Sequence, residues 1–177
     1  MIVFSNTTPI IALSSIQRLD LLPHLFGHIH LVNEVVDECE AGGTIAVPSL
    51  RGLDWLTLVE STPVSHSSLL LELDKGEKHT LDMAQKHQAD WVLIDEKIGR
   101  NMAEYLGLKV TGTIGVLLKA KQQGLIPSFL DSVNAMQAQG IYYQTFENLL
   151  DFLKRFVILW CFKLIFKTCM KALLSTI

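Results

Sequence analysis

The sequence lacks the cysteine patterns that would crosslink a chain or bind zinc. It has three cysteines, Cys39, Cys161 and Cys169, and no two of them stand in a C-x-x-C spacing. An odd number without that spacing argues against a disulfide framework and a zinc knuckle, and it fits a reducing compartment. The opening residues MIVFS also lack a basic segment followed by a long apolar run, so no signal peptide is expected. We therefore expect a cytoplasmic protein.

Charge is sparse as well, and there is no basic excess. Charged residues make up 19% of the chain, and the net charge is −3 at pH 7. Because phosphate binding usually requires a basic surface, this balance does not by itself indicate a nucleic-acid binder. A nucleic-acid partner would have to be bound by a local basic patch or through a metal ion.

What the chain does have is a regular alternation of apolar runs and helical patterns. Its 177 residues, 49% of them apolar, suffice for one domain with a core. Runs typical of buried strands occupy residues 1–5, 28–32, 91–94 and 108–110, with a shorter one at 56–59 inside the loop-rich segment 44–68. Helical patterns occupy residues 7–16, 18–26, 33–41, 77–87, 100–106 and 112–123. This order predicts an α/β fold with a parallel sheet covered on both faces.

Acidic and amide side chains stand where such a sheet places its ligand site. In these folds ligands bind beyond the carboxyl ends of the strands. The candidate residues are Asn6, Glu38, Glu77 and Asp95. Hard cations such as Mg²⁺ and Mn²⁺ prefer oxygen ligands, so convergence of these groups would form a metal site. On spacing alone, surface carboxylates that complement helix dipoles are the more common interpretation.

Three blocks of sequence resemble PIN-domain proteins, in particular a bacterial branch related to VapC-type toxins. The blocks are IVFSNTTPIIALSSIQRLDLL at the start, LDKGEKHTLDMA, and ADWVLIDEKIGRNMAEYLGLKVTGTIGVLLKAK. The resemblance covers residues 1–150, which we expect to form one PIN-like domain. Residues 151–177 would then be an apolar C-terminal segment outside it.

The resemblance implies a three-layer α/β/α sandwich around a central parallel sheet, with an acidic cluster that binds Mg²⁺ or Mn²⁺. Members of the family are typically endoribonucleases that cut single-stranded RNA, and many are toxins paired with an antitoxin. Carried over by position, the metal ligands are Asn6, Glu38, Glu77 and Asp95, and the last three are also the catalytic acids. Thr7 or Thr8 stands where a hydroxyl commonly accompanies the first acid, and we expect Thr7 to contact substrate.

Asn6 departs from the family pattern because it brings no charge. An amide oxygen can coordinate a hard cation, yet the ion should bind more weakly or through water. Glu34 and Asp37 are alternatives to Glu38 on the same segment. Asp82 and Glu96 are alternative ligands, which we interpret as solvated charges.

Two further positions are candidate phosphate contacts. Arg100, with Lys97, follows one turn after Asp95, and arginine is well suited to phosphate. Ordinary surface ion pairs explain these residues equally well. Gly112 and Thr113 start a helix whose free N–H groups could bind a phosphate, although a tight turn also needs glycine.

Residues 156–177 are strongly apolar, with Lys163, Lys167 and Lys171 four apart. A membrane span is disfavoured because these lysines would lie within the bilayer. We expect a helix that docks on a second copy or on an antitoxin-like partner. An interfacial membrane helix and an accidental extension of the reading frame are the alternatives.

Two functions follow from these observations. The first is a metal-dependent ribonuclease, the toxin of a toxin–antitoxin pair. The second is a PIN-like module with little or no catalysis that binds RNA or a protein partner. Residue 6 is the feature that separates them.

Overall fold

A parallel sheet forms the centre of the molecule. The computed structural model describes residues 1–63 and 73–141, which lie in one compact unit, Met1–Ile141. Within these residues the strands are β1 (Val3–Ser5), β2 (Ile29–Val32), β3 (Leu56–Val59), β4 (Trp91–Leu93) and β5 (Val110–Thr111). Their order is β3-β2-β1-β4-β5, and every pairing is parallel. The predicted α/β class and parallel sheet are confirmed. The expectations for residues 151–177 fall outside the described residues.

β1 lies in the middle of the sheet because it is apolar and short. Val3 pairs with Ile29 on one side and with Trp91 on the other. All three residues of β1 are buried, as a strand covered on both faces should be. Because the strands are parallel, the residues that follow β1 and β4 emerge at the same edge.

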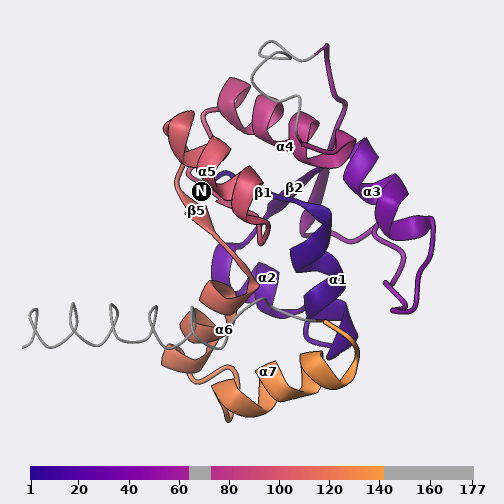
Figure 1. The fold of residues 1–177 in the computed structure, drawn as a ribbon, viewed down its shortest axis with the longest axis vertical. Helices are drawn as coiled ribbons and strands as arrows, with labels where there is room; N and C mark the ends of the chain where they lie inside the picture. The colour runs from indigo at the N-terminus through magenta and orange to yellow at the C-terminus, as the bar shows by residue number, and fades with distance from the viewer. Residues whose placement is uncertain (64–72, 142–177) are drawn as a thin grey trace, which may run out of the picture. The chain divides into compact units, whose positions relative to one another are not determined.

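Helices cover both faces of the sheet (Figure 1). The helices are α1 (Thr7–Ser15), α2 (Leu21–Phe26), α3 (Asn33–Glu40), α4 (Lys75–Lys86), α5 (Lys97–Tyr105), α6 (Thr113–Gln122) and α7 (Phe129–Ala138). α3 and α4 pack against each other and against the sheet, and so do α2 and α6. α7 packs on α6 and α1. The predicted three-layer arrangement is therefore present.

Local chemistry sets where the helices begin and end. α4 starts two residues before the predicted Glu77, because the Asp74 side chain caps it by accepting a hydrogen bond from the Glu77 N–H at 2.7 Å. Gly27 and Gly107 follow α2 and α5 with φ of 78° and 77°, a conformation that favours glycine. α7 has no counterpart among the predicted helices. None of the helices in the described parts of the chain is both long and apolar enough to cross a membrane.

We predict that β4 contributes strongly to stability through Leu93, which is fully buried. Replacing it by alanine leaves a cavity and should lower the free energy of unfolding by about 3 kcal/mol. The matched control is Leu58→Ala on the edge strand β3, where the side chain is 39% exposed. This change should cost less than about 1 kcal/mol. Urea unfolding of both variants measures the difference, and equal losses would contradict the position of β4 in the core.

Candidate functional site

The start of α1 gathers three acidic side chains from three different elements. Each of the first three residues at this end contacts one of them. The contacts join Asn6 to Glu77 of α4, Thr7 to Glu38 of α3, and Thr8 to Glu96 at the start of α5. These contacts lie where β1 and β4 end. The Asn6 N–H, just after β1, donates to the carbonyl of Leu93, the last residue of β4, at 2.9 Å. The predicted edge of the sheet therefore does carry an acidic group.

Asn6 and Glu77 form the buried part of this group. They are 2% and 5% exposed. Asn6 Nδ2 donates to Glu77 Oε1 over 3.4 Å. Although Asn6 stands at the N-cap of α1, its side chain makes no capping hydrogen bond. Its Oδ1 is buried and has no hydrogen-bond partner. The amide thus supplies a donor to the carboxylate and leaves an oxygen unused.

Glu38 lies beside this pair at the surface. Its carboxylate accepts a hydrogen bond from Thr7 Oγ1 and another from the Gly76 N–H at 3.1 Å. Because Gly76 precedes Glu77 in the chain, the second bond holds Glu38 near Glu77. The hydroxyl of Thr7, predicted to contact substrate, is used here to hold Glu38.

The two alternatives to Glu38 are engaged elsewhere. Glu34 accepts from Ser61 Oγ at 2.6 Å and lies 3.5 Å from His79 Nδ1. Asp37 forms an exposed ion pair with Arg51 at 2.7 Å. Among the three candidate acids of α3, Glu38 is therefore the one tied to the start of α1.

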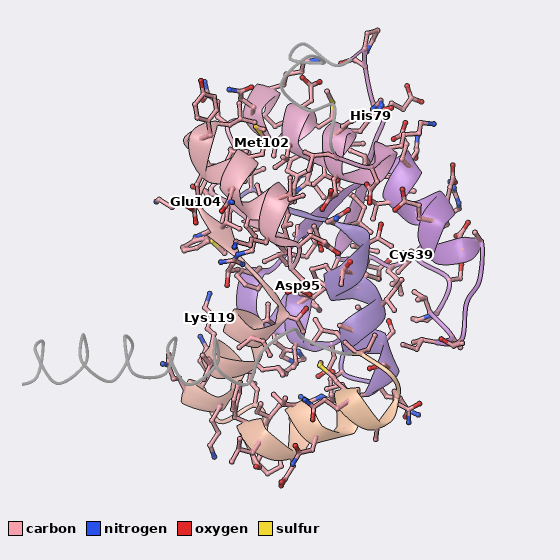
Figure 2. The ribbon with its side chains drawn as sticks, in the orientation of Figure 1. Cys39, His79, Asp95, Met102, Glu104 and Lys119 are labelled. Atoms are coloured by element: carbon pink, nitrogen blue, oxygen red, sulfur yellow. The ribbon has the colours of Figure 1, made fainter. Side chains whose placement is uncertain are left out.

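The adjacent acids Asp95 and Glu96 face different partners. Both carboxylate oxygens of Asp95 accept hydrogen bonds from Thr113, one from the N–H at 2.7 Å and one from Oγ1 at 2.6 Å. Asp95 is therefore joined to the start of α6 (Figure 2). Glu96 instead accepts from Thr8, and its Oε2 is buried without a partner. Glu96, interpreted from the sequence as a solvated charge, is part of the site.

Two other expectations change with this geometry. Thr113 is fully buried, and both its N–H and its hydroxyl are bound to Asp95. Because Asp95 uses both donors, a phosphate at Thr113 would have to displace that carboxylate. Asp82 lies 2.6 Å from Lys86 Nζ on the same helix, in an ion pair. Arg100, the other predicted phosphate contact, donates to the Ile94 carbonyl at 3.0 Å.

Burial and like charge raise the pKa of two of these carboxyl groups. The pKa of Glu77 rises from 4.5 to about 7, first because of burial and then because of the charges of Asp74 and Glu96. Burial raises the pKa of Asp95 from 3.8 to about 6, and the hydrogen bonds from Thr113 oppose that rise. An acid that is half protonated near neutral pH is typical of functional sites.

Three glycines make room for the acids, a signal that the sequence analysis missed. A Cβ at Gly76 would lie 2.6 Å from Glu38 Oε1, and one at Gly99 would lie 2.8 Å from Glu77 Oε1. A Cβ at Gly112 would collide with Asp95 Oδ1. None of the three has a positive φ, so the requirement is for space. Each predicted acid therefore lies against a residue without a side chain.

These residues suit a divalent cation, although they do not surround one in advance. In the described parts of the chain, no group of three or more His, Cys, Asp or Glu side chains is arranged to hold a metal ion. The predicted set of ligands is therefore not preassembled. The donors that remain are oxygens, and two of them, Asn6 Oδ1 and Glu96 Oε2, are buried without partners. Unpaired buried oxygens beside a carboxylate are the donors that Mg²⁺ and Mn²⁺ prefer.

Comparisons with known proteins give one match. A family model described as a PIN domain matches residues 2–154 of the chain. No curated protein matches, and neither does any solved structure.

We predict that Glu77 makes the metal-free protein less stable as the pH rises. Its pKa is higher in the folded chain than in the unfolded one, so its contribution is complete below about pH 4.5 and is lost by about pH 7. The difference between the wild type and Glu77→Gln should change by about 3 kcal/mol across that window. Urea unfolding in EDTA at several pH values measures it. A constant difference would mean that the Glu77 pKa is not raised.

We also predict that Asn6→Asp destabilises the metal-free protein. It replaces the donor to Glu77 by a second carboxylate, which should cost about 2 kcal/mol in EDTA. Mn²⁺ should restore the loss and bind more tightly than to the wild type, because the new ligand is charged. Thermal melts and calorimetric titration measure both effects, with Asn101→Asp on the exposed side of α5 as the control. Equal stability and equal Mn²⁺ affinity would exclude residue 6 from the site.

Proposed function

Because the chain belongs to the PIN-domain family, whose members are generally nucleases, we propose that it is a metal-dependent endoribonuclease that cuts single-stranded RNA in the cytoplasm. The observation that carries the proposal is the buried oxygen-rich group at the start of α1, with Asn6 Oδ1 and Glu96 Oε2 unpaired. The preference for single-stranded RNA rests on the resemblance of the three sequence blocks to VapC-type proteins.

The metal would be Mg²⁺ or Mn²⁺, held by Asn6 and Glu77 together with Glu38 and an acid that follows β4. Glu38 is exposed and the acids after β4 are partly exposed. When bound, such an ion supplies a water nucleophile at neutral pH and stabilises the charge that develops on phosphate. Two raised carboxyl pKa values indicate that metal binding will displace protons.

The chain's own side chains position these acids and bind the substrate. Thr7 and Thr8 orient Glu38 and Glu96 through their hydroxyls. Lys97 and Arg100 lie on α5, which begins just after Glu96. They place two cations beside the site, although the chain has a net charge of −3. We propose that these two residues contact the RNA phosphates.

A second function is favoured by one contact. In the metal-free chain the Asn6 amide already satisfies part of Glu77, a role that a cation would otherwise have. A PIN-like module with weak catalysis, which binds RNA or a protein partner, is therefore the alternative. A toxin–antitoxin pair would add a small antitoxin-like protein to either function, and self-association of the chain is a further proposal.

The test is cleavage of a labelled single-stranded RNA with Mg²⁺, with Mn²⁺ and with EDTA. We expect cleavage that requires metal and is lost at least a hundredfold in Glu77→Gln, in line with the loss of an essential acid. The control is Glu104→Gln, an exposed residue on the outer side of α5 (Figure 2). RNA binding without cleavage would support the alternative function. Cleavage that survives in Glu77→Gln would exclude this site.

A further inference from the structure

We infer that Glu96, and not Asp95, is the acid after β4 that binds the metal, and that Asp95 is a positioning residue that fixes the start of α6. The metal part of this inference rests on the proposed function. It reverses the roles that the sequence assigned to these neighbours, where Asp95 was the ligand and Glu96 a solvated charge.

Both oxygens of Asp95 already accept a hydrogen bond from the start of α6. Thr113 donates its N–H to Oδ1 and its hydroxyl to Oδ2, over 2.7 and 2.6 Å. Turning the carboxylate toward Glu77 would leave both Thr113 groups unpaired in a fully buried residue. The first N–H of α6 is also where the helix dipole favours a negative charge.

The surroundings of Asp95 are built to keep it in this position. Gly112 leaves the space that Oδ1 occupies, since a Cβ there would collide with the carboxylate. The Arg100 guanidinium approaches the same glycine and is held by the Ile94 carbonyl at 3.0 Å. The attraction between Arg100 and Asp95 stabilises the carboxylate form against burial. Asp95 is thus held at the start of α6 by Thr113.

Glu96 has the opposite surroundings. One oxygen accepts from Thr8 at the start of α1, and the other is buried without a partner. The helix that follows Glu96 lies against Glu77, since a Cβ at Gly99 would lie 2.8 Å from Glu77 Oε1. Two adjacent carboxylates are costly unless a proton or a cation lies between them, and a cation would also use the oxygen of Glu96 that has no partner.

An independent observation shows that a ligand belongs at this point. Asn6 is 98% removed from solvent, at 2% exposure, and its Oδ1 has no partner even though Nδ2 donates to Glu77. No hydrogen-bond donor reaches this buried amide oxygen, which lies next to two carboxylates. A hard cation bound by Asn6, Glu77 and Glu96 would use each of these free oxygens.

The experiment is calorimetric titration of the full chain with Mn²⁺, combined with thermal melts in EDTA. Glu96→Gln and Asp95→Asn are a matched pair, since each removes one charge and keeps the shape of the side chain. Thr113→Val removes the hydroxyl that holds Asp95 and leaves the Asp95 and Glu96 side chains unchanged. Its control is Thr113→Ser, which keeps the hydroxyl. Asp95→Ala removes both hydrogen bonds to α6.

We expect Glu96→Gln to weaken Mn²⁺ binding roughly tenfold or more, the scale of a lost ionic ligand, with an unchanged or higher Tm in EDTA. Asp95→Asn should bind Mn²⁺ as the wild type does. Asp95→Ala and Thr113→Val should each lower the Tm, and the double variant should lose less than the sum, because both changes break the same contact.

Opposite results would overturn the inference. It fails if Glu96→Gln binds Mn²⁺ as the wild type does, or if Asp95→Asn abolishes binding at an unchanged Tm. It also fails if Thr113→Val weakens Mn²⁺ binding as much as Glu96→Gln does, because the Asp95 that Thr113 holds would then be acting as a ligand. A wild-type chain that binds no Mn²⁺ would overturn the proposed metal-dependent function together with the role of Glu96. The melts of Asp95→Ala and Thr113→Val would still test the role of Asp95.

Discussion

The site depends on the way the first turn of α1 holds carboxylates. The side chains of Asn6, Thr7 and Thr8 bond three acids that come from α3, α4 and α5. The same helix end carries a partial positive charge, so both the hydrogen bonds and the field favour negative groups there. β1 delivers this end to the middle of the sheet, between β2 and β4. Three otherwise separate helices are thereby brought to one place.

That arrangement carries an electrostatic cost that the structure reduces in more than one way. A protonated Glu77 removes one charge, and the Asn6 amide offers a donor to it. Asp95 is moved out of the group and bound to α6 instead. The acidic edge of the sheet is therefore two adjoining structures, the proposed ligand group at α1 and a carboxylate bound to the start of α6. Their adjacency in sequence hides this difference in role.

The sequence predicted the strands and most helices because their apolar runs are short, continuous and bounded by capping residues and glycines. It also predicted that Asn6, Glu38, Glu77 and Asp95 would lie at one edge, because the carboxyl ends of parallel strands share an edge and because the three blocks resemble PIN-domain proteins. It could not separate Asp95 from Glu96. Successive side chains just after a strand point in different directions, and which one faces the cleft depends on where α5 and α6 pack. Gly76, Gly99 and Gly112 were missed because a need for space shows no local signature.

The amide at residue 6 also affects whether the chain must bind an ion in order to fold. Where an acidic cluster cannot form without its cation, folding and ion uptake are one event. Here a neutral side chain donates to Glu77 from within the protein, so the edge of the sheet can close on its own. Under the proposed metal-dependent function, the chain would fold before its ion binds, and its folded amount would not depend on the supply of divalent cations.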